Sequence, residues 1–152
     1  MISNLGKLVL TLCLLTVGGG VVANAQIDSD IRIQANVPFA FAVGNTTLPA
    51  GNYEIKRVDD NAPNVLELRS ADGRTSVVFE TENAQTRDDQ AASKTELVFD
   101  KFGDEYFFSQ LWVSGSVSGS ELPKSRMEKR LASGGSQMEK HSLAAVLKHL
   151  KP

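Results

Sequence analysis

Residues 31–43 read IRIQANVPFAFAV, and the regular alternation of side chains along this stretch decides the fold class. Apolar residues occupy every odd position, whereas Arg32, Gln34 and Asn36 occupy even ones. A period of two is typical of a half-buried β-strand and argues against a helix. Pro38 interrupts the pattern, and proline lacks the N–H group that a sheet ladder needs. We therefore expect a strand that lies at a sheet edge, is bulged, or is split in two near Pro38.

Five further strands are expected downstream, because short apolar runs alternate there with turn signals. They cover residues 53–58, 65–69, 75–81, 95–99 and 106–113, while the polar residues 82–93 and the Gly/Ser-rich residues 114–120 are expected to form loops. Strands joined in order by short turns favour an antiparallel meander. The sequence thus predicts a mainly β fold of about six strands, as a two-layer sandwich or a small barrel. The sandwich is preferred, because Pro38 would mark the point where the first strand changes sheet.

The C-terminal residues 124–152 show helical signals instead. Residues 125–128 (SRME) and 136–139 (SQME) both fit a capping box, and glycines separate the two. An apolar stripe with helical spacing follows, formed by Leu143, Val146, Leu147 and Leu150. We expect one or two helices here. A short isolated helix is marginal in water, so the second should pack on its own sheet, on a second copy of the chain or on a partner.

The N-terminal 25 residues have the properties of a secretory signal peptide. Lys7 gives a positive start, Leu8–Val22 is an apolar run, and Ala23-Asn24-Ala25 is a small-x-small cleavage site. We expect cleavage after Ala25 and a periplasmic or extracellular product. The expected organisation is a signal peptide (1–25), a β-domain (26–123) and a basic helical tail (124–152).

The cysteine content restricts the chemistry of the exported chain. The sequence has one cysteine, Cys13, which lies inside the signal segment. A cysteine-free mature chain has no disulfide, no thiolate nucleophile and no cysteine metal site. No segment after the signal is apolar enough to span a membrane.

Charge is distributed unevenly along the chain. Residues 26–123 hold 16 acidic and 8 basic residues, whereas residues 124–152 hold 2 acidic and 7 basic ones. The basic tail either docks on the acidic body, is simply solvated, or contacts an anionic partner. Nucleic acid is not expected, because its binding needs concentrated positive charge on a basic protein. The candidate contacts to an anionic partner are Lys124, Arg126, Lys129 and Arg130.

The last expected strand is rich in aromatic residues. Tyr106, Phe108 and Trp112 share one parity of residues 106–113. An exposed row of this kind could stack on sugar rings or dock a protein, and these three residues are the candidate binding platform. The alternative is that they belong to the core, where most large apolar side chains lie.

No catalytic constellation, metal site or cofactor motif is evident in the sequence. His141 and His149 are eight residues apart, which on a helix is too far for both to bind one metal ion. Carboxylates are plentiful, but no pair stands out; Glu80 and Glu82 share one face of an expected strand and are most simply a solvated face. We therefore expect no catalytic residues, no metal and no cofactor.

Two segments carry a resemblance to a known group. The stretch VPFAFAVG (37–44) with LPAGNY (48–53), and FGDEYFF (102–108) followed by Trp112 and ELPKS (121–125), resemble a group of small secreted bacterial proteins without an assigned activity. The resemblance covers most of residues 31–132. It implies a secreted β-domain and supplies no catalytic residues.

These observations together predict a secreted, non-catalytic β-module that binds or organises a polymer or protein of the cell envelope or the extracellular space. The alternative is a carboxylate-dependent hydrolase of an extracellular polymer, which only the abundance of Asp and Glu favours.

Overall fold

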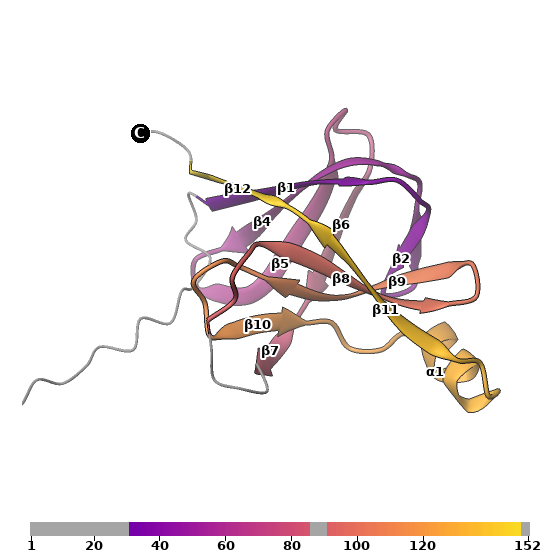
Figure 1. Cartoon of the computed structure of the whole chain (residues 1–152). Coiled ribbons are helices and arrows are strands. Elements are labelled where there is room, and N and C mark those ends of the chain that lie inside the picture. Colours follow the sequence, from indigo (N-terminus) through magenta and orange to yellow (C-terminus); the bar gives the residue numbers. More distant parts are fainter. Residues whose placement is uncertain (1–30, 86–90, 150–152) are drawn as a thin grey trace, which may run out of the picture.

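The computed structural model describes residues 31–85 and 91–149, and the predicted signal peptide lies outside them. The described chain forms two β-sheets that face each other, with one helix at the end of the second sheet (Figure 1). The first sheet has the order β12 (Val146–His149), β1 (Ile31–Val37), β4 (Gly51–Asp59), β5 (Ala62–Ser70), β6 (Ser76–Glu80). The second has the order β11 (Met138–Ala144), β8 (Glu96–Phe102), β9 (Glu105–Trp112), β10 (Ser118–Glu121), β7 (Glu82–Gln85). The hairpin β2 (Phe41–Val43) and β3 (Thr46–Leu48) joins the second sheet through β9.

The mainly β, sandwich-like fold is thus confirmed, and the two sheets do not close into a single barrel within the described residues. The sequence predicted about six strands, but the structure has more. The additional short strands β3, β7 and β10 lack an apolar run, and their backbone pairing alone defines them. A single meander is also too simple, since consecutive strands pair with each other only in the runs β2–β3, β4–β5–β6 and β8–β9–β10.

Four short corners carry the chain from one sheet to the other, and one of them, at residues 49–50, separates β3 from β4. Pro38 follows β1 in the first sheet and precedes β2 in the second, as the sequence predicted. Thr81 separates β6 from β7, and Ala145 separates β11 from β12. The buried Thr81 is held by two bonds to the carbonyl of Asn64, one from its N–H at 2.8 Å and one from its hydroxyl at 3.1 Å. These corners connect the two layers covalently at several points.

The core fills the space between the two sheets. The odd-numbered residues of β1 point inward, so that Ile33 and Val37 are fully buried, as the alternation in the sequence indicated. Phe41 meets Tyr53 and Phe99 edge to face at centroid distances of 5.2 and 5.5 Å, a favoured aromatic geometry. The other large apolar side chains that are fully buried are Val43, Leu48, Ile55, Leu66, Leu68, Leu97 and Leu111.

The first predicted C-terminal helix is present as α1 (Arg126–Ser133). Its capping box is complete, because the Ser125 hydroxyl accepts the Glu128 N–H at 3.1 Å and the Glu128 carboxylate accepts the Ser125 N–H at 2.7 Å. Glu128 is almost fully buried. This helix is the only one among the described residues, and it is too short to cross a membrane.

The prediction of a second C-terminal helix is wrong. Residues 138–149 form the strands β11 and β12, which run in yellow across the front of Figure 1. Seven residue pairs join β11 to β8, and four join β12 to β1. These long-range ladders outweigh the local helical signal, and Leu143, Ala145 and Leu147 pack against the core. The helix that was considered for contact with a second copy of the chain is therefore absent, and the segment pairs with β8 and β1 of its own domain.

Candidate functional site

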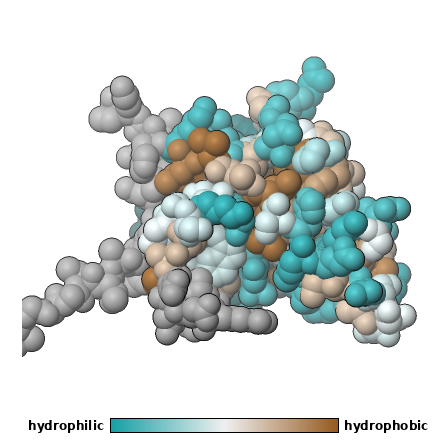
Figure 2. All heavy atoms as spheres, in the orientation of Figure 1, coloured by the Kyte–Doolittle hydropathy of each residue, from teal (hydrophilic) through white to brown (hydrophobic). Residues whose placement is uncertain are grey.

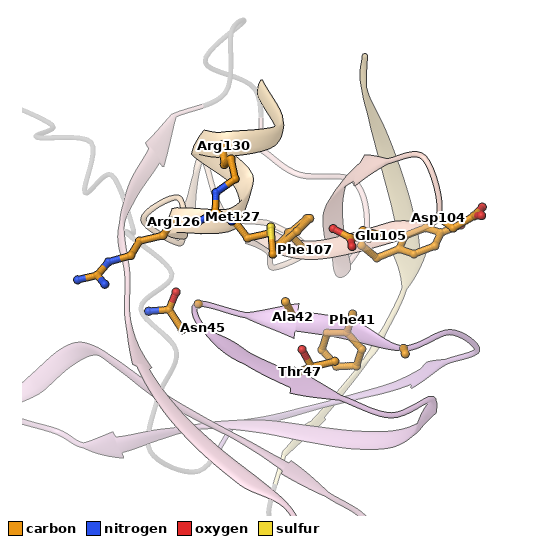
Figure 3. A pocket seen from close by; sticks show the side chains of 13 residues that line it. Phe41, Ala42, Asn45, Thr47, Asp104, Glu105, Phe107, Arg126, Met127 and Arg130 are labelled. Atoms are coloured by element: carbon orange, nitrogen blue, oxygen red, sulfur yellow. The ribbon is translucent and has the colours of Figure 1, made fainter. Parts of the chain in front are cut away.

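A hollow of about 430 Å³ lies between three parts of the fold: α1, the β2–β3 hairpin and the start of β9 (Figure 3). We call it the α1 groove. Its lining residues are Ala40, Phe41, Ala42, Gly44, Asn45, Thr47, Asp104, Glu105, Tyr106, Phe107, Arg126, Met127 and Arg130. The volume falls in the range of about 300–1,000 Å³ that is usual for small-ligand sites.

Residues of two tight turns line part of this groove. Gly44 has φ +59° and Gly103 has φ +60°, and each opens a two-residue turn between paired strands. Turns of this kind need positive φ at their first central position, which glycine adopts without strain. The parallel pairing of Ala42 with Phe107 then places the two hairpins side by side.

The floor of the groove is apolar. Phe107 is only 4% exposed and meets Phe102 edge to face at 6.0 Å. Met127, on α1, is 44% exposed, and Figure 3 shows it over Phe107. A flexible thioether beside an aromatic ring can adapt to ligands of different shape.

Charged groups stand at opposite ends of this floor. In Figure 3, Arg126 extends toward the end where Asn45 lies, whereas Glu105 lies at the other end with its carboxylate turned toward Phe107. Asp104 lies beside Glu105 but points away from the groove. No ion pair with a described residue is formed by any of these four charged side chains, which are Arg126, Arg130, Asp104 and Glu105. The groove therefore keeps unneutralised charge of both signs.

The helix that carries the two arginines is anchored at its N-terminal end. Glu128, in the first turn of α1, is buried and takes part in the capping box with Ser125. Just before α1, the Lys124 ammonium lies 2.7 Å from the carboxylate of Asp100, which also accepts from Lys140 at 2.5 Å. The hydrogen bond to Asp100 raises the pKa of Lys124 in spite of partial burial. These contacts fix the first turn of α1 over the groove.

Of the four basic residues that were predicted to contact an anionic partner, the structure places two at the α1 groove and two elsewhere. Arg126 and Arg130, one helical turn apart, line the α1 groove. Lys129 is exposed and does not line it, and Lys124 is bound to Asp100. Part of the basic tail thus docks on the acidic body, while two of its arginines remain available.

The three aromatic residues of the predicted platform do not share one surface. The register between β8 and β9 shifts after Val98, so that Ser109 is an extra residue and the faces of β9 are exchanged beyond it. Phe108 is 2% exposed in the core, and Tyr106 stacks on Phe39 at 3.8 Å and reaches the groove. Trp112 lies on the opposite face, against Gly119 of β10. The parity in the sequence could not reveal this bulge.

The remaining candidates from the sequence lie apart. His141 packs edge to face on Phe39 and Tyr106, at centroid distances of 5.3 and 5.6 Å. Glu80 ends a strand of the first sheet and Glu82 begins one of the second, and both are exposed. No group of three or more His, Cys, Asp or Glu residues able to hold a metal ion occurs in residues 31–85 and 91–149.

A second, larger hollow of about 640 Å³ lies on the outer face of the first sheet, but several of its polar groups are already paired with one another. Glu54 accepts bonds from Arg32 and Gln34, and the amide of Asn36 donates to Asn52 at 2.8 Å. Satisfied groups have less to gain from a ligand. In the space-filling view of Figure 2, the surface around α1 is mostly hydrophilic, consistent with the free charges of the α1 groove.

Sequence reasoning missed Asn45 and Glu105 as site residues. Both sit at or beside the tip of a hairpin, and the only signals were the Gly-Asn and Gly-Asp turns next to them. No protein-family model matches the chain, and neither the curated proteins nor the solved structures that were searched gave a match.

Proposed function

We propose that this chain is an exported, non-catalytic binding module that holds a small ligand in the α1 groove. The single observation that carries the proposal is the presence of uncompensated charge at both ends of a preformed apolar floor. The predicted signal peptide supports export, and the ligand would then come from the periplasm or the extracellular medium.

Physical chemistry favours a ligand with at least one anionic group. Arginine presents a planar fork of donors that matches a carboxylate or a phosphate, and Arg126 and Arg130 lie one helical turn apart. Hydrogen bonds to charged groups contribute about 1.5–3 kcal/mol each. Contact with Phe107 and Met127 adds apolar burial at roughly 25 cal/mol per Å². A ligand that combines an anion with an apolar body uses both.

Hexanoate, an anion with an apolar chain, provides a direct test. We expect titration of hexanoate into the ¹⁵N-labelled protein to shift the backbone NMR signals of Ala42, Phe107 and Met127. The double variant Arg126→Ala/Arg130→Ala should lose most of this response. The matched control is Arg74→Ala/Lys129→Ala, which removes two exposed positive charges that do not line the groove.

Two outcomes would overturn the proposal. One is an equal response of the arginine variant and its control, because the arginines would then not bind the anion. The other is turnover of glycan, ester or peptide substrates by the purified protein that Glu105→Gln abolishes, since the groove would then be catalytic.

A further inference from the structure

We infer that the ligand of the α1 groove is a short peptide with free termini and an apolar middle residue. Its C-terminal carboxylate would lie at Arg126 and Arg130, and its N-terminal ammonium at Glu105. This inference rests on the proposed function, whose site it shares, and it adds the chemical class and the orientation of the ligand.

The order of groups along the groove carries the inference. Figure 3 shows the guanidinium of Arg126 at one end, Phe107 and Met127 in the middle, and the inward-turned carboxylate of Glu105 at the other end. A molecule with a negative group, an apolar centre and a positive group in this order pairs with all three regions. A short peptide with free termini has this order by its covalent structure.

The groove also offers partners for peptide groups between the two ends. Asn45 supplies an amide and Thr47 a hydroxyl, and both side chains are exposed at the groove. Side chains that donate and accept can bind the N–H and C=O groups of a peptide bond. Apolar centre and polar backbone are therefore both accommodated.

Other ligand classes fit less well. A simple anion such as hexanoate would pair with the arginines but would leave the carboxylate of Glu105 without a partner. A neutral sugar would leave the charges at both ends without partners and would cover them from water, which is costly. Nothing in these two classes uses the acidic end of the groove.

The tripeptide Ala-Leu-Ala and its two blocked forms test the inference. We expect the free peptide to bind about tenfold more tightly than either the N-acetylated or the C-amidated form, measured by calorimetry or NMR titration, because each block removes one charged contact. In Arg126→Ala/Arg130→Ala, amidation should no longer matter, whereas acetylation still should. In Glu105→Gln, acetylation should no longer matter, whereas amidation still should. Glu80→Gln, an exposed acid on β6 away from the groove, is the charge-matched control.

The outcomes separate this inference from the proposed function. Equal affinity of all three peptide forms, or loss of the acetylation effect in the arginine variant instead of in Glu105→Gln, would overturn the peptide orientation. Binding of hexanoate without binding of any tripeptide would overturn the peptide class and leave the binding module standing. Failure of both ligands would overturn both.

Discussion

Replacing Asp100 or its two lysine partners should destabilise the protein to different degrees. The Asp100 carboxylate is 1% exposed, whereas the side chains of Lys124 and Lys140 are 46% and 47% exposed. In Asp100→Ala both ammonium groups return to water, so only the hydrogen bonds and the attraction are lost. We expect a cost of about 2–3 kcal/mol in the free energy of unfolding, at the scale of hydrogen bonds to charged groups.

The double variant Lys124→Met/Lys140→Met should cost more, about 3–5 kcal/mol, because it leaves a buried carboxylate without a partner. Urea denaturation followed by tryptophan fluorescence measures both values, and Lys129→Met serves as the control for an exposed lysine on α1. Hydrogen exchange should show lost protection in residues 138–144, which Lys140 holds against β8. A double-lysine variant as stable as the unmodified protein, or more stable than Asp100→Ala, would refute this reasoning.

The same carboxylate predicts an acid dependence. Burial by itself raises the pKa of Asp100, but the hydrogen bonds from Lys124 and Lys140 outweigh it and hold the pKa below its usual value of 3.8. The stabilisation from this group is therefore fully present above pH 3.8 and is lost as the pH falls through the lower folded pKa. Gly119→Ala should cost about 1–3 kcal/mol, because the added methyl would lie 2.8 Å from the ring of Trp112; a melting temperature equal to that of the unmodified protein would contradict it. Tyr53→Phe removes a hydroxyl that donates at 2.6 Å to the backbone carbonyl four residues earlier, and should cost about 1 kcal/mol in urea denaturation. Glu128→Ala breaks the capping box and should cost about 1 kcal/mol and weaken hexanoate binding, since α1 positions both arginines; unchanged affinity would separate the cap from the groove.

The reading of the first strand from sequence succeeded, because its signals were local. The alternation in residues 31–37 and the corner at Pro38 depend on neighbouring residues only. The second helix failed because the spacing of Leu143 and Leu147 fits two periods. Four residues apart is one helical turn, but it is also an even number, which keeps both side chains on one face of a strand. Val146 decides between the two: it is 59% exposed, as a strand requires, and belonged to the apolar stripe only in the helical reading.

Some residues of the candidate site could likewise be predicted from the sequence, and others could not. The charge imbalance of the tail pointed to Arg126 and Arg130, which do line the groove. Asn45 and Glu105 could not be placed with them, because they are far apart in the sequence and only the pairing of β2 with β9 brings them to the same groove. Long-range pairings of this kind leave no trace in one segment alone.

The strands β11 and β12 determine when the two sheets can be completed during synthesis of the chain. Because β12 borders β1 in one sheet and β11 borders β8 in the other, neither layer is complete until the ribosome has delivered residues 138–149. A nascent chain that lacks them exposes the edges of β1 and β8. Both sheets therefore reach their final form only once residues 138–149 have been synthesised, and such late completion is compatible with the export that the signal peptide predicts.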